Sequence, residues 1–136
     1  MRRVLALFAF LFLAGPAAAQ GDPESAYRAF HQSVLGPFNP QLWISQLPAA
    51  KRAAFDKDTQ ASLKWVNAVQ FMKDEMPRSY RITGKTGSGR SMRLTATGQG
   101  KGFMGKPEEQ SGVIDLVEES GAWKIDGLTW GKRKLP

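Results

Sequence analysis

Residues 113–130 read VIDLVEESGAWKIDGLTW, and apolar side chains alternate with polar ones on both sides of a central Ser-Gly pair. Alternation with a period of two is typical of a strand that buries one face. The Ser120-Gly121 pair fits a two-residue turn, which sets Leu116 opposite Ile125. The stretch therefore predicts an antiparallel hairpin whose apolar face holds Ile114, Leu116, Trp123 and Ile125.

A second hairpin precedes this one in the sequence. Residues 80–83 and 92–97 alternate in the same way, and the glycine-containing segment 84–89 between them predicts the turn. Residues 98–107 contain four glycines, which we interpret as a flexible connection to the second hairpin. The two hairpins together predict a four-stranded antiparallel meander.

Helices are expected before the strands. Asp22 ahead of a proline predicts the start of a first helix that stops at Gly36. A second, short helix is expected from Asn39 to Pro48, and a longer third one from near Asp58 to Met76. Their apolar stripes are Tyr27, Phe30 and Val34 in the first, Leu42, Trp43 and Leu47 in the second, and Trp65, Val69, Met72 and Met76 in the third. Helices followed by strands predict an α+β fold.

The first twenty residues, MRRVLALFAFLFLAGPAAAQ, have the pattern of a cleavable secretory signal. Two arginines precede an apolar run of residues 4–14, which is shorter than the ~20 residues that span a bilayer as a helix. We expect cleavage between Ala19 and Gln20, and no transmembrane segment. The predicted product is a single domain at residues 20–131 with a short basic tail at 132–136, exported to the periplasm or secreted.

Composition excludes several classes of function. The chain of 136 residues has no cysteine and one histidine, so disulfide scaffolds and cysteine-ligated zinc are excluded, and we expect no metal and no cofactor. The net charge of +7 is concentrated in residues 76–107, while residues 108–131 are acidic. Neighbouring strands of opposite charge predict cross-strand ion pairs, and pairing the apolar faces places Arg93 near Glu119. With this charge used internally and no nucleic-acid module present, nucleic acid is not an expected partner.

The order of helices and strands, with the closing segment Gly121-Ala122-Trp123-Lys124-Ile125-Asp126 and Trp130, resembles small exported bacterial members of the nuclear transport factor 2-like superfamily. This resemblance implies a cystatin-like cone of N-terminal helices packed on a curved antiparallel sheet. It also implies a pocket between the long helix and the sheet, and frequent dimerisation, here a homodimer through the sheet. Members are either enzymes or binding proteins, so the fold leaves the function open. The aromatic residues that such a pocket would use are Tyr27, Phe30, Trp43, Trp65, Tyr80 and Trp123.

Three polar residues are candidates for chemistry, although no set of catalytic residues of the family matches this sequence. His31 and Tyr80 are interpreted either as pocket groups or as ordinary structural residues. Asp115 falls opposite Asp126 in the predicted hairpin, which gives either a carboxylate pair with one raised pKa, or half of a calcium site, or two solvent-facing acids. The alternation favours the solvent-facing arrangement.

The sequence therefore predicts an exported, non-catalytic binding or interaction domain with a small apolar or aromatic ligand or a protein partner. One alternative is a small isomerase, dehydratase or hydrolase that uses a polar group in the pocket. Another is an envelope-associated basic protein with weak contact to anionic membranes through Lys132, Arg133 and Lys134. Exposed Phe103 and Met104 in the glycine-rich connection are expected to cover the pocket or to meet a partner.

Overall fold

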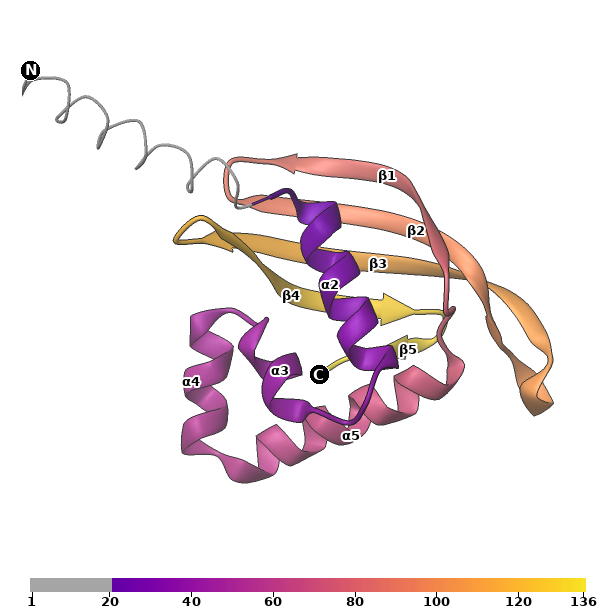
Figure 1. The fold of residues 1–136 in the computed structure, drawn as a ribbon, viewed down its shortest axis with the longest axis horizontal. Helices are drawn as coiled ribbons and strands as arrows, with labels where there is room; N and C mark the ends of the chain where they lie inside the picture. The colour runs from indigo at the N-terminus through magenta and orange to yellow at the C-terminus, as the bar shows by residue number, and fades with distance from the viewer. Residues whose placement is uncertain (1–20) are drawn as a thin grey trace, which may run out of the picture.

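The computed structural model describes residues 21–136, and the predicted signal sequence with its cleavage site at Ala19 and Gln20 lies outside the described residues. Within residues 21–136, four α-helices come first and five strands follow, in the order that defines an α+β fold. The helices lie on one face of the sheet, and α2 crosses the middle of that face (Figure 1). The predicted α+β class is confirmed.

Helix α2 (Pro23–Leu35) begins where the sequence predicts it. The Asp22 carboxylate accepts a hydrogen bond of 2.7 Å from the backbone N–H of Ser25, and a proline occupies the first helical position. Tyr27, Phe30 and Val34 are all buried on one face, as their spacing predicts. This face fixes the helix on the sheet and so positions the residues of the candidate site.

The remaining helices include one that the sequence did not predict. Helix α3 (Pro40–Ser45) and helix α5 (Thr59–Glu75) match the expected second and third helices. Between them lies α4 (Ala49–Lys57), which follows Pro48 without a side-chain cap and buries none of its residues. The sequence AAKRAAFDK has only one large apolar side chain and therefore no apolar stripe to reveal it.

The sheet is a meander in which each strand pairs with the next along the chain. Its strands are β1 (Tyr80–Ser88), β2 (Ser91–Lys101), β3 (Pro107–Glu119), β4 (Ala122–Trp130) and β5 (Arg133–Lys134). The expected turn at 84–89 is mostly strand, because β1 continues to Ser88. The expected flexible connection at 98–107 is likewise largely strand, and only the short helix η1 (Phe103–Gly105) and its flanks join β2 to β3.

The predicted register is confirmed near the turn and wrong beyond it. Leu116 faces Ile125, and Leu94 faces Ile114. A β-bulge then shifts the pairing, so that Asp115 faces Gly127 and Asp126 has no partner in the ladder. The bulge also brings Leu128 and Trp130 onto the buried face, where both are at most 3% exposed.

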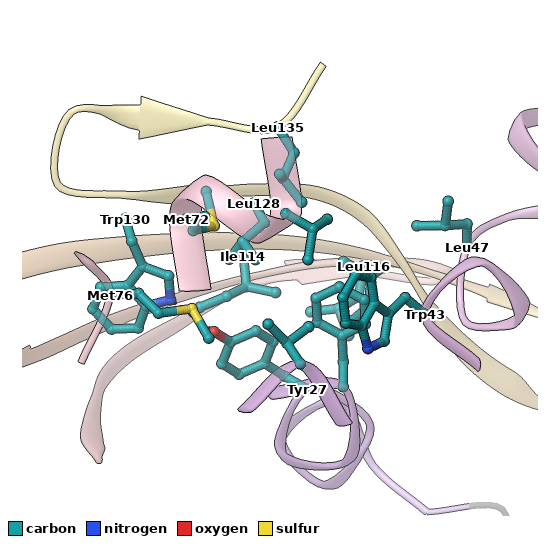
Figure 2. Close-up of a cluster of buried hydrophobic side chains, with 14 of the residues drawn as sticks. Tyr27, Trp43, Leu47, Met72, Met76, Ile114, Leu116, Leu128, Trp130 and Leu135 are labelled. Atoms are coloured by element: carbon teal, nitrogen blue, oxygen red, sulfur yellow. Dashed lines mark hydrogen bonds between the residues drawn. The ribbon is translucent and has the colours of Figure 1, made fainter. Parts of the chain in front are cut away.

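The core lies between the helices and this face of the sheet (Figure 2). Figure 2 shows Tyr27 reaching toward Trp130 beneath α2, with Met72 and Met76 of the α5 end beside them. The stripe predicted for α5 is confirmed, since Trp65, Val69, Met72 and Met76 are all buried. The residues expected as a basic tail also belong to this fold: Arg133 and Lys134 form β5, and Leu135 is buried.

Candidate functional site

A chain of hydrogen-bonded side chains lies beneath α2. Trp130 Nε1 donates to the Tyr27 hydroxyl at 2.7 Å, and this hydroxyl lies 3.0 Å from Nδ1 of His31. His31 Nε2 lies 3.3 Å from the carbonyl oxygen of Arg78. A carbonyl only accepts, so Nε2 carries the proton, and Nδ1 accepts from Tyr27. The donors therefore run in one direction, from Trp130 through Tyr27 and His31 to the backbone.

Burial keeps His31 and Tyr27, the two titratable residues of this hydrogen-bonded series, uncharged. His31 is 3% exposed. Its removal from water lowers the pKa of the imidazole, against the opposing effect of the Arg78 and Pro77 carbonyls. Burial likewise raises the pKa of the Tyr27 hydroxyl. Both ring nitrogens of His31 are engaged within the protein, so the imidazole positions its neighbours and offers no free lone pair to a substrate.

Tyr80 lies beside this chain at the start of β1. Its ring centroid is 4.8 Å from that of His31 and 5.3 Å from that of Tyr27. His31 and Tyr80 both line a hollow of about 460 Å³, which Arg28 and Arg78 border. Burial raises the pKa of Tyr80, and the nearby Arg28 acts against this. The structure thus brings two of the three polar candidates, His31 and Tyr80, to one place.

We expect the stability of the fold to fall as the pH drops below about 6.5, the ordinary pKa of histidine. The folded protein holds His31 neutral with a lowered pKa, so the unfolded chain binds more protons in this range. His31 is the single histidine of the sequence. Urea unfolding from pH 7.5 to about 5 measures the slope, which is expected to flatten in His31→Gln.

NMR titration of His31 in the folded protein measures the pKa of the imidazole directly and so tests the same prediction. Its midpoint is expected below 6.5 because burial lowers the pKa. Carboxylates with lowered pKa values, such as Asp22 and Glu75, contribute at more acidic pH. An unchanged pH slope in His31→Gln, or a midpoint at or above 6.5, would show that the imidazole is not kept neutral by the fold.

Asp115, the third polar candidate, lies elsewhere. Its two carboxylate oxygens accept from Arg93 Nε at 2.7 Å and from Arg93 Nη2 at 3.0 Å. The predicted pairing of Arg93 with Glu119 is therefore wrong, since the ladder places Arg93 directly across from Asp115. The Asp115–Asp126 pair is wrong as well, because the bulge leaves Asp126 out of register. Asp115 is thus held in an ion pair on the face away from the helices.

Ion pairs confirm that the basic and acidic hairpins are neighbours. Arg93 pairs with Asp115 across β2 and β3, and Arg90 approaches Glu118 at 3.6 Å. Two other described pairs join the sheet to helices instead, one between Lys85 and Glu24 at 2.8 Å and one between Arg133 and Glu75. Each exposed pair is worth at most about 1 kcal/mol, so together they favour the register more than they stabilise the fold.

The predicted pocket aromatics mostly fill the core. Tyr27, Phe30, Trp43 and Trp65 are each at most 1% exposed, and Tyr80 and Trp123 are partly buried against the same cluster. Trp43 is also fixed by a bond of 3.0 Å from its Nε1 to the carbonyl oxygen of Ser33. Of the six, Tyr80 borders the hollow at His31 and Trp65 borders a second hollow, described next.

A groove of about 570 Å³ lies between α4 and α5. Phe55 of α4 and Trp65 of α5 line it with their ring centroids 5.9 Å apart. The other apolar lining is small: Pro48, Ala50, Ala54, Ala61 and Pro136. Because α4 carries alanines where a packed helix would carry large side chains, the two helices leave space between them. No pattern in the sequence predicts this groove, because nothing in residues 49–57 predicts α4.

Two lysines and one carboxylate border the groove. Lys64 is exposed on α5. Lys51 on α4 approaches the carbonyl oxygens of Asp126 and Pro136 at 3.5 and 3.4 Å. Asp126 reaches this border because the bulge turns it out of the ladder. The arrangement is an apolar slot with a positively charged margin, which suits an apolar molecule that carries an anionic group.

Residues 21–136 contain no group of three or more His, Asp or Glu side chains placed to hold a metal ion. In the same range, every helix is too short or too polar to cross a bilayer. The homodimer expected through the sheet stays a prediction; the face turned from the helices carries Thr95, Thr97, Val113 and Val117, all partly buried.

Comparison with known proteins gives a likeness of fold. No family model matches the sequence, and no curated protein matches it. The structure is similar to the solution structure of a SEC-C motif containing protein from Rhodopseudomonas palustris, with a TM-score of 0.51 and 15% sequence identity. The likeness covers 85% of this chain and 86% of that one. The suspected resemblance to the nuclear transport factor 2-like superfamily is therefore wrong, because the structural match is to a protein of a different description.

Proposed function

We propose that this chain is an exported, non-catalytic binding protein that takes a small apolar or aromatic ligand in the groove between α4 and α5. The observation that carries the proposal is the lining of the groove, which is apolar except at its charged margin. Phe55 presents aromatic surface to a planar ligand in front of the buried Trp65, and the alanines leave room for the ligand. The signal-like residues 1–20 support export.

The polar candidates support binding over catalysis. A general acid or base needs a free donor or acceptor at the reacting atoms. His31 uses both ring nitrogens within the protein, and Asp115 is paired with Arg93 on the other side of the sheet. The three candidates thus do not meet in one pocket, and the enzyme alternative has no assembled set of groups.

The experiment fills the groove with a larger side chain and measures the affinity of a fluorescent probe whose chemistry suits the groove. Anilinonaphthalene sulfonate is apolar, aromatic and anionic, and its fluorescence rises in an apolar site. Ala54 lines the groove from an exposed position on α4, so Ala54→Leu places a larger side chain inside it. We expect the affinity of the probe to fall by about tenfold.

Ala53→Leu is the matched control, because Ala53 is exposed on the same helix and does not line the groove. It should leave the affinity unchanged. Lys64→Gln should weaken the sulfonate probe and spare the neutral analogue phenylnaphthylamine, since only the sulfonate meets the charge. Equal affinity in Ala54→Leu and the native chain, with both folded by circular dichroism, would place the probe elsewhere and refute the proposed site.

A further inference from the structure

The hairpin that joins β2 to β3 carries two large apolar side chains at its tip. Phe103 is 84% exposed and Met104 is 80% exposed, the highest values among the large apolar residues described. Figure 1 shows this hairpin extending past the helices, at the end of the sheet opposite the β1–β2 and β3–β4 turns. Neither side chain belongs to the core cluster, so both are available to a partner.

The tip is built as a defined turn. The N–H of Gly102 donates to the carbonyl of Lys106 at 2.6 Å, and the N–H of Gly105 donates to the carbonyl of Gly102 at 3.1 Å. Met104 has φ 59° and ψ 28°, a left-handed conformation that residues with a Cβ rarely adopt. The turn therefore keeps an unfavourable backbone conformation at Met104, at the point of the hairpin where Phe103 and Met104 are both exposed.

Cations and carboxylates both lie around this apolar tip, and the cations are in excess. Lys101 and Lys106 flank it in the sequence, and neither forms an ion pair with another described residue. Lys101 borders two hollows at the base of the tip, one of about 410 Å³ that includes Arg78, and one of about 430 Å³ that includes Lys132. The carboxylates that line these hollows are Asp74, Glu108 and Glu75, and Glu75 is neutralised by Arg133.

We propose that this tip docks on an anionic phospholipid surface. An aromatic and a flexible apolar side chain at the end of a narrow protrusion enter the headgroup boundary without moving the core. Lys101, Lys106 and Lys132 then lie at the height of the lipid phosphates, which they attract. A convex apolar point flanked by Lys101 and Lys106 complements a flat anionic layer better than it complements a protein groove.

The structure also changes which cations take part. The sequence alone pointed to Lys132, Arg133 and Lys134 as the membrane contact. Arg133 is bound to Glu75 and its guanidinium lies 5.5 Å from the ring centre of Phe71, so it is used within the fold. Lys134 is exposed in β5, but it lines neither hollow at the base of the tip. Only Lys132 of the three borders a hollow at the base of the tip.

Vesicle sedimentation tests this directly, with protein that begins at Gln20, because residues 21–136 contain the whole described core. The native chain is expected to sediment with vesicles of phosphatidylcholine and phosphatidylglycerol and to remain in solution with phosphatidylcholine alone. Phe103→Ser/Met104→Ser should weaken binding by about tenfold, and Lys101→Gln/Lys106→Gln by a similar factor. Added salt should weaken the native chain more than the lysine variant.

Leu63→Ser is the matched control, because Leu63 is 51% exposed on α5 and lies away from the tip. It and Ala54→Leu should bind vesicles like the native chain. A Phe103→Trp variant adds an exposed indole whose emission should shift to the blue on binding. Absence of binding to the anionic vesicles, equal binding to neutral ones, or full binding by the serine variant would each overturn the proposal.

Discussion

Gly100→Ala is expected to lower the free energy of unfolding by about 3 kcal/mol. A Cβ at this position would lie 2.4 Å from the carbonyl oxygen of Glu75 and 2.5 Å from Nε2 of Gln110. The first of these atoms is backbone, so relief requires α5 to move away from β2. The second belongs to a buried amide that donates to the carbonyls of Glu75 and Lys101 at 3.1 and 3.3 Å. Urea denaturation of the two proteins measures the loss.

Gly127→Ala is the matched control for this prediction. Gly127 is also a strand glycine, but a Cβ there would meet Asp115 atoms at 3.5 Å and beyond, which is ordinary contact. We expect its stability to stay within about 1 kcal/mol of the native value. If both variants lose the same free energy of unfolding, the loss is the general effect of replacing a strand glycine by alanine. It would then not come from the close approach of the end of α5 to Gly100.

Tyr27→Phe is expected to cost about 2 to 3 kcal/mol, although it removes a single oxygen atom. Without the hydroxyl, Trp130 Nε1 keeps a buried proton with no acceptor, and His31 Nδ1 keeps a lone pair with no donor. Both residues are buried, since Trp130 is 2% exposed and His31 is 3% exposed. The midpoint of urea unfolding at pH 7.5 should fall accordingly.

Tyr80→Phe is the control for this prediction, because it also removes a phenol hydroxyl but breaks no hydrogen bond to Trp130 or His31. Tyr80 is partly buried, and its hydroxyl lies outside the chain of hydrogen bonds that joins Trp130, Tyr27 and His31. Its replacement should change stability by less than about 0.5 kcal/mol. A loss in Tyr27→Phe no larger than in Tyr80→Phe would mean that the buried partners find other bonds.

The elements with a strong period were predictable from the sequence. Tyr27, Phe30 and Val34 marked α2, and the Ser120-Gly121 turn set the register of Leu116 with Ile125. The bulge was not predicted, but it has a trace in the sequence. The alternation that puts Trp123 and Ile125 on one face changes phase before Leu128 and Trp130, and an extra residue between them is what a bulge supplies.

The strand glycines and the hydrogen bond between Trp130 and Tyr27 were not predicted. Glycines are more typical of turns, and the hydrogen bond leaves no local pattern in the sequence. Glycines indicate a turn at residues 84–89 and a flexible connection at residues 98–107, yet Gly84, Gly98 and Gly100 lie in strands. A Cβ at Gly98 would approach the Ser79 carbonyl at 2.6 Å, so close packing explains this glycine, where the prediction assumed a flexible chain. The hydrogen bond between Trp130 and Tyr27 joins residues 103 positions apart, which no local pattern reveals.

The candidate site was only partly predictable for a related reason. His31 and Tyr80 were named from their residue types, and the fold brings them together. The groove needs α4, and the four alanines among its nine residues give no amphipathic pattern from which to predict a helix. The resemblance to a known superfamily drew attention to a pocket between helix and sheet, a space that Trp43, Trp65 and Trp130 help to fill.

The absence of buried residues in α4 has a consequence for how the groove is entered. With little apolar surface to expose, this helix can detach at a small cost in free energy while the rest of the fold stays intact. Its backbone amides should therefore exchange hydrogen for deuterium much faster than those of α2 or α5. Each such excursion removes one wall of the groove, so the proposed ligand would be released whenever α4 detaches.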